Sequence, residues 1–177
     1  MTLIPVPLNG QEHGFIHAEG EMFMDEDGEP WPFHGYTIHT WLNTLILEGE
    51  AAFNRMLDEP IELGYNTILG HTMHVAPYKT GWPQATRLDP LEHTDFYDKL
   101  ARGFDIAAER KIRIANGVWA DVQYWPGNRQ QHWQKCCEGM RGRWNVFARK
   151  GNEGPVNGWD PAEYTFPHMG GVLTSQG

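Results

Sequence analysis

The sequence predicts an α/β fold built from repeated strand–helix units. Apolar stretches with helical spacing alternate with short apolar runs, and the chain follows the order strand, helix, strand, helix, strand, helix, strand. This alternation is typical of a parallel sheet whose strands are joined by right-handed crossovers. No GxGxxG pattern follows the first predicted strand, so the sequence does not support a dinucleotide-binding version of the fold.

Four apolar runs are the predicted strands. We expect them at 31–38, 66–71, 112–119 and 144–148. Their spacing is close to that in a (β/α)8 barrel of the TIM type, which takes about 250 residues in full. A chain of 177 residues with four such strands therefore predicts a half or truncated (β/α)8 barrel.

Helical spacing of apolar residues predicts three helices between these strands. The first covers 50–63, where Pro60 is expected to kink or divide it. The second covers about 94–111, and the third about 128–141, after the capping residue Asn128. The remainder is expected to be loop-like, with a short helix near residue 160.

Residues 11–30 predict an N-terminal β-hairpin, because two short apolar segments flank a turn-forming pair at 19–20. This hairpin is expected to cover the bottom of the larger fold. The length of the chain favours a single domain over 1–177.

Composition and charge disfavour several functional classes. A net charge of −9 disfavours binding to nucleic acid and to anionic membrane surfaces. No run approaches the ~20 apolar residues of a membrane span, and the first residues lack the pattern of a signal peptide. The adjacent cysteines Cys136 and Cys137 lie in a helical pattern and cannot easily pair. A cytoplasmic location is therefore the default expectation.

Polar and aromatic residues gather where the predicted strands end, and in a barrel these ends meet on one face. The residues expected to bind substrate there are His39, His74, Trp119, Asp121, Tyr124, Trp125 and Asn152. The aromatic residues among them are equally compatible with core packing or with a platform for a sugar ring.

Glu153, directly after the fourth strand, is the predicted catalytic residue. A general acid needs a carboxyl group that stays protonated, which a partly buried position favours. The neighbouring Asn152 has an amide that can hydrogen-bond a sugar hydroxyl. The alternative is that Asn152, Glu153 and Gly154 form an ordinary polar loop, since three-residue motifs recur by chance.

The histidines raise a metal-dependent hydrolase as another alternative. His71 and His74 are three residues apart, but neither an HExxH nor a CxxC pattern is present. We therefore predict no metal and no cofactor.

Several phrases of the sequence resemble the clan A glycoside hydrolases, especially the cellulase-like family. Residues 23–36 resemble the opening hairpin and first strand, 63–68 (Leu-Gly-Tyr-Asn-Thr-Ile) resemble the approach to the second strand, and 151–153 (Gly-Asn-Glu) resemble the end of the fourth strand. The sequence departs from the family at Leu69, where an Arg is usual, and at 121–123, where a His is frequent.

The resemblance implies a retaining hydrolase of β-glycan O-glycosyl bonds. Glu153 would be its general acid/base, and Asn152 would contact the sugar 2-hydroxyl. The nucleophile of this family comes from the seventh strand, which lies beyond the four predicted here. The implied partner is an oligo- or polysaccharide. The alternative is a non-catalytic carbohydrate-binding or structural half barrel that self-associates or binds a chain completing the barrel.

Overall fold

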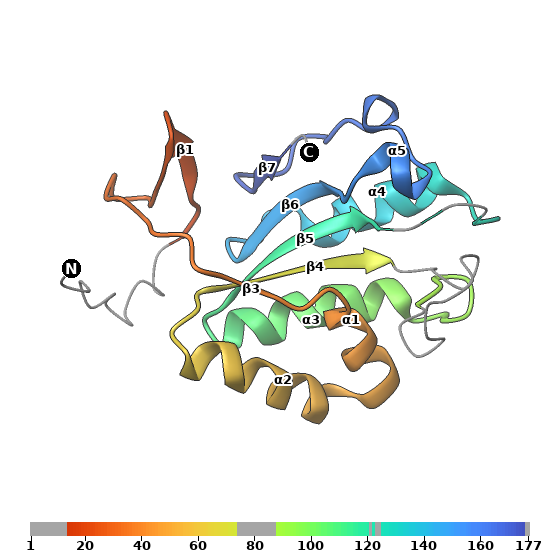
Figure 1. The fold of residues 1–177 in the computed structure, drawn as a ribbon, viewed down its shortest axis with the longest axis horizontal. Helices are drawn as coiled ribbons and strands as arrows, with labels where there is room; N and C mark the ends of the chain where they lie inside the picture. Colours follow the sequence, from red (N-terminus) through yellow and green to blue (C-terminus); the bar gives the residue numbers. More distant parts are fainter. Residues whose placement is uncertain (1–13, 74–87, 121, 123–124, 176–177) are drawn as a thin grey trace.

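The computed structural model describes residues 14–73, 88–120, 122 and 125–175. Its centre is a five-stranded sheet in which every neighbouring pair of strands is parallel. In spatial order the strands are β3 (Gly35–Thr37), β4 (Thr67–Met73), β5 (Arg113–Trp119), β6 (Val146–Gly151) and β7 (Leu173–Ser175) (Figure 1). The predicted α/β class is confirmed.

The strands follow one another in chain order across the sheet. Doubly wound sheets reverse this order at a switch point, and none occurs between β3 and β7. Because crossovers between parallel strands are right-handed, an unreversed order places the connecting helices on one face. These helices are α2 (Glu50–Glu62), α3 (Phe96–Glu109) and α4 (Arg129–Met140).

Alternate residues of each strand point to opposite faces of the sheet and enter two separate cores. On the helix face, Ile68, Ile114 and Val146 belong to the large core that includes the buried residues of the helices. On the opposite face, which we call the hairpin face, Ala115 and Phe147 form a smaller core with Ile16 and Trp31.

The helix face is completed by a short segment after β3 that the sequence did not predict. It consists of α1 (Trp41–Asn43) and a π-helical turn, η1 (Thr44–Glu48). Trp41 is fully buried, and its indole Nε1 donates to Asn116 Oδ1 at 3.3 Å. Asn116 Nδ2 in turn donates to Thr72 Oγ1 at 2.6 Å, so polar side chains on the inner strands are paired within the core.

The hairpin lies where the sequence predicts one. Its strands are β1 (His17–Glu19) and β2 (Met22–Met24), and the loop is Gly20–Glu21, one residue later than expected. Figure 1 shows it beside the end at which the sheet strands begin. Phe23 and Trp31 pack on Phe147, with ring centroids 5.9 and 5.7 Å apart.

Arg113, the first residue of β5, fastens the hairpin segment to the sheet. Its guanidinium lies 5.2 Å from the ring centroid of Trp31 and 4.8 Å from that of Trp144. Its Nη2 donates to the carbonyl of Gly14 at 3.0 Å, and its Nη1 donates to the carbonyl of Trp144. Burial lowers the pKa of Arg113 to about 10, so the group is a cation at neutral pH despite its enclosure.

The predicted helices and strands agree with the structure apart from their ends, but α1, η1, α5 (Gly154–Asn157) and β7 were not predicted. Pro60 lies inside α2 without dividing it, and Asn128 Oδ1 caps α4 by accepting from Gln131 N at 3.0 Å. A 3-10 turn, η4 (Pro161–Glu163), occupies the position of the predicted short helix. The prediction of four strands is wrong, because β7 adds a fifth beside β6.

In the parts of the chain that the structure describes, no helix combines the length and the apolar character needed to cross a membrane.

We expect Arg113→Met to lower the free energy of unfolding by roughly 2–3 kcal/mol. The substitution keeps an apolar stem but removes the cation that lies over the rings of Trp31 and Trp144. It also leaves the carbonyls of Gly14 and Trp144 without this donor. Urea denaturation followed by tryptophan fluorescence measures the change. Arg55→Met, on an exposed position of α2, is the matched control and should shift stability by less than about 0.5 kcal/mol. Equal stability of the two variants would contradict the fastening role.

Candidate functional site

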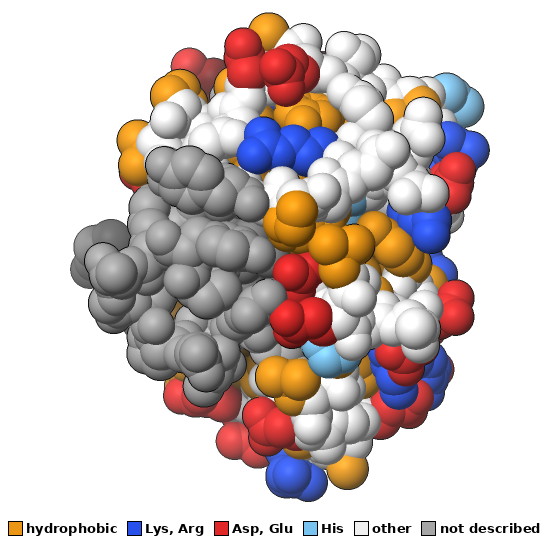
Figure 2. Space-filling model, turned by 90° about the vertical axis from the view of Figure 1, so that its right-hand side faces the viewer, with side chains coloured by type: hydrophobic (Ala, Val, Ile, Leu, Met, Phe, Trp, Pro, Cys, Tyr) orange, Lys and Arg blue, Asp and Glu red, His pale blue; other side chains and the backbone are white. Residues whose placement is uncertain are grey.

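The carboxyl ends of β4, β5 and β6 lie along one edge of the sheet, on the right in Figure 1. Figure 2 looks onto this edge and shows hydrophobic side chains beside acidic ones and a histidine. Parallel α/β sheets place their ligand sites outside this edge, so residues that follow these strands are the candidates for function.

Asn152 follows β6, and both its backbone N–H and its backbone carbonyl are hydrogen-bonded. Its N–H donates to the carbonyl of Trp119 at the end of β5, at 2.9 Å. Its own carbonyl accepts from Asn157 Nδ2 at 2.8 Å and from Trp159 Nε1 at 3.3 Å. Asn157 and Trp159 are both buried, so the peptide after Asn152 is fixed to the core.

Glu153 adopts a left-handed backbone conformation, with φ 42° and ψ 59°. Its carbonyl accepts from the N–H groups of Val156 and Asn157, both at 3.0 Å, and so starts the short helix α5 (Gly154–Asn157). Lys111 also has a positive φ, but it follows the end of α3, where this conformation is common. The left-handed conformation of Glu153 costs on the order of 1–3 kcal/mol, and Glu153 is also the predicted catalytic residue.

The side chain of Glu153 is exposed, and Asn152 Nδ2 donates to its Oε2 at 3.3 Å. The sequence therefore predicted correctly that these two residues follow a buried strand at the carboxyl edge. The partial burial expected for a general acid is not provided by the described residues. In the described part of the chain, no hydrogen bond or ion pair joins Glu153 to a second carboxylate.

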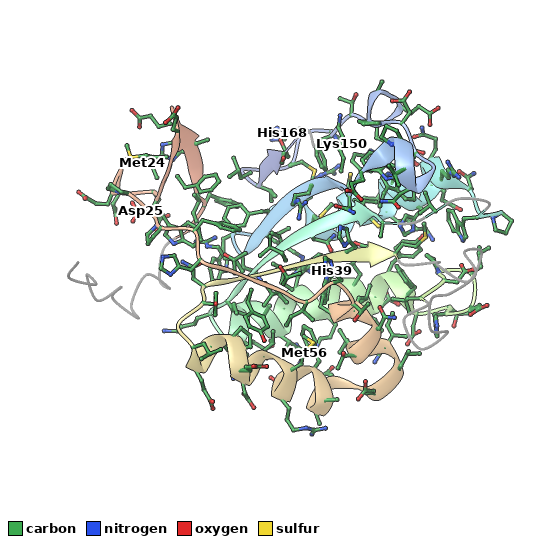
Figure 3. All side chains as sticks on the ribbon, in the orientation of Figure 1. Met24, Asp25, His39, Met56, Lys150 and His168 are labelled. Atoms are coloured by element: carbon green, nitrogen blue, oxygen red, sulfur yellow. The ribbon has the colours of Figure 1, made fainter. Side chains whose placement is uncertain are left out.

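His39, which follows β3, and His71, which lies on β4, pack against each other at the same edge of the sheet. Their rings are stacked, with centroids 5.7 Å apart and planes 12° apart. The ring of His71 lies over Gly117, where an added Cβ would come within 2.6 Å of His71 Cδ2. Figure 3 shows His39 beside β4. Among the described residues no three His, Cys, Asp or Glu side chains cluster in a way that could hold a metal ion.

Trp119 and Trp125 are buried, with 0% and 6% exposure. Trp119 packs against His132 and Tyr164, with ring centroids 5.0 and 5.1 Å away. Trp125 Nε1 donates to Asp89 Oδ1 at 2.9 Å. Of the two alternatives for these residues, burial favours core packing over a sugar platform.

The remaining predicted site residues, His74, Asp121 and Tyr124, lie outside the described residues.

A buried polar network on α4 was missed by the sequence interpretation. His132 Nδ1 lies 2.9 Å from the hydroxyl of Tyr97, and its Nε2 lies 3.4 Å from Cys136 Sγ. The four-residue spacing of His132 and Cys136 places both on one helix face, and this was the available signal. Burial lowers the pKa of His132 to about 3 and raises the pKa of the Cys136 thiol well above its usual range. The pair is therefore neutral and is not an activated nucleophile.

We expect His132 to make the protein sensitive to acid. A buried base with a lowered pKa contributes stability above its unfolded pKa of about 6.5, and this is lost as the pH falls towards about 3. Between pH 7 and pH 4 the free energy of unfolding of the wild type should fall by roughly 3 kcal/mol more than that of His132→Gln, whose side chain at this position does not titrate. Urea denaturation at each pH measures this difference. His17→Gln, at an exposed position of β1, should behave as the wild type does. Parallel pH profiles for all three proteins would refute the assignment.

We expect Asn157→Leu to loosen the peptide between Asn152 and Glu153. The variant keeps a buried side chain of similar size but removes the 2.8 Å donor to the Asn152 carbonyl, which should cost about 1–2 kcal/mol. Hydrogen exchange of the backbone N–H groups at positions 156 and 157 should become faster in the same variant. The control is Val156→Ala, which shortens an exposed side chain of the same turn. Unchanged exchange in Asn157→Leu would show that Trp159 alone holds this peptide.

Comparison with protein-family models and with curated proteins finds no match for this chain. The resemblance to glycoside hydrolases therefore stays a prediction from the sequence. The described residues establish a parallel α/β sheet and a fixed Asn152–Glu153 pair at its carboxyl edge.

Proposed function

We propose that this chain contains the acid/base part of a retaining β-glycan hydrolase, with Glu153 as general acid/base and Asn152 as the residue that orients the sugar. The observation that supports this most strongly is the position of the pair. Asn152 and Glu153 directly follow β6 at the carboxyl edge of a parallel sheet, and their backbone is fixed by Trp119, Asn157 and Trp159. Catalytic groups need such support from rigid elements.

The chemistry assigned to Glu153 is proton transfer in two directions. Its carboxyl group donates a proton to the glycosidic oxygen while the bond from that oxygen to C1 breaks and a second carboxylate forms a bond to C1. The resulting carboxylate of Glu153 then takes a proton from a water molecule that forms a bond to C1, while the bond from C1 to the second carboxylate breaks and releases the sugar. The exposed side chain of Glu153 is free to meet a substrate at this edge.

The nucleophile must come from outside the five strands. Retaining enzymes place their two carboxyl groups about 5–5.5 Å apart. In the family that the sequence resembles, the nucleophile follows the seventh strand, and β3 to β7 would correspond to the first five. Further strands that complete the barrel would therefore supply the second carboxylate.

Three features favour a truncated barrel over a doubly wound sheet. The strands follow chain order without reversal, the helices share one face, and the hairpin covers the end where the strands begin. In a barrel the face opposite the helices is the interior.

A non-catalytic carbohydrate-binding or structural module is the second candidate. The observation in its favour is that β3 and β7 are edge strands in the described sheet, which invites association with another chain. A completing chain or a second copy would then be the partner.

We expect azide to act in place of the second carboxylate, which the described residues do not bring to Glu153. Azide attacks C1 of phenyl β-cellobioside, the bond from C1 to the phenolic oxygen breaks, and Glu153 gives its proton to that oxygen. The product is α-cellobiosyl azide, of inverted configuration, which chromatography and NMR can identify. Glu153→Gln should lower the rate by roughly a hundredfold or more, because the poor leaving group needs the acid.

Glu163→Gln is the matched control, since Glu163 is an exposed carboxylate in the turn that follows Glu153. It should form the azide product at the wild-type rate. Product formation by Glu153→Gln at that same rate would remove Glu153 from the acid/base role. Cello-oligosaccharide binding without any azide product would favour the binding module instead.

A further inference from the structure

The hairpin face of the sheet is organised in rows, because residues in register on parallel strands lie side by side. One row is apolar and crosses four strands, and the next row towards the carboxyl edge is polar. The apolar row is Leu69, Ala115, Phe147 and Leu173. The polar row is His71, Gly117, Arg149 and Ser175.

A hollow of about 450 Å³ lies between this face and the hairpin. All four side chains of the apolar row line it, together with Phe23 and Phe33 from the hairpin segment. The small side chains of Ala18 and Ala115 leave the space unfilled. Its volume lies within the range of about 300–1,000 Å³ that is typical of small-molecule sites, and such sites are mostly apolar with a few polar groups.

Arg149 provides the polar group of this hollow. Its side chain is half-buried and lines the hollow at the polar row, next to Thr174 and Ser175. Within the part of the chain that the structure describes, the guanidinium of Arg149 makes no hydrogen bond or ion pair. An unpaired guanidinium next to apolar surface favours an anion, above all a carboxylate that it can bind with two parallel hydrogen bonds.

We propose that the hollow is a binding site for an amphipathic carboxylate, with its apolar body on the row from Leu69 to Leu173 and its head group on Arg149. The order of the rows fixes the orientation, because the apolar end of the ligand lies towards the hairpin and the carboxylate towards the carboxyl edge. The proposal concerns the five-stranded sheet as the structure describes it and does not rest on the acid/base assignment of Glu153. In a barrel completed by further strands this face would be the packed interior, so a bound ligand and a completed barrel are alternatives for it.

A second copy of the chain fits this hollow less well. A symmetric contact would bring the same patch, with the same Arg149, onto the face, and so would supply a second cation instead of an anion. The net charge of −9 on each copy opposes that contact further.

Isothermal titration calorimetry with octanoate and octan-1-ol tests the proposal, since the two probes share an apolar chain and differ in the head group. The wild type should bind octanoate more tightly than octan-1-ol. Arg149→Met, which keeps an apolar stem, should weaken octanoate binding by at least about tenfold and leave octan-1-ol binding within about twofold. The matched control is Arg55→Met on the exposed side of α2, which should bind both probes as the wild type does.

Ala115→Leu fills the hollow and should weaken the binding of both probes. Circular dichroism establishes that this variant is folded, and the Arg149→Met comparison decides the matter if it is not. Equal affinity of the wild type and Arg149→Met for octanoate would overturn the proposal, as would the absence of binding of either probe. Light scattering that shows a dimer dissociated by octanoate would assign the face to a second copy and would also overturn it.

Discussion

The central strand β5 is the constraint on which the rest of the structure depends. All of its residues from Arg113 to Trp119 are buried, and it pairs with β4 on one side and β6 on the other. Ile114 and Val118 enter the core of the helix face, Ala115 enters that of the hairpin face, and Trp119 at the end of the strand joins the first of these cores. A shift of register by one residue would exchange the two sets, placing Ile114 under the hairpin and an alanine under the helices, so the pairing is strongly specified.

The two ends of β5 position the two proposed sites, the hollow beside the hairpin and the pair Asn152 and Glu153. At its start, Arg113 holds the hairpin segment against the sheet through Gly14 and Trp31. The hollow lies between that segment and the sheet. At the end of β5, the carbonyl of Trp119 accepts the N–H of Asn152 and fixes where the chain leaves β6. The strained conformation of Glu153 persists because the backbone bonds on either side of it determine the path of the chain.

Features set by local patterns could be predicted from the sequence, and features set by pairing could not. The helices, the hairpin and the Asn128 cap depend on residues close in the chain, as does the position of Asn152 and Glu153 after a strand. The three-residue strand β7 exists only because Leu173 and Ser175 find partners on β6. The burial of Trp119 depends on His132 and Tyr164, which are distant in sequence, so no periodicity could decide between core and platform.

Burial distinguishes the two groups of side chains whose residue types suit acid/base or nucleophilic chemistry. His132 and Cys136 have the spacing and the contact of a nucleophile and its base, but complete burial keeps both neutral and denies them a substrate. Glu153 is an exposed carboxylate on a fixed backbone, and it lies at the edge where strands of a parallel sheet end. Proton transfer requires access to a substrate, and of these two groups only Glu153 is exposed.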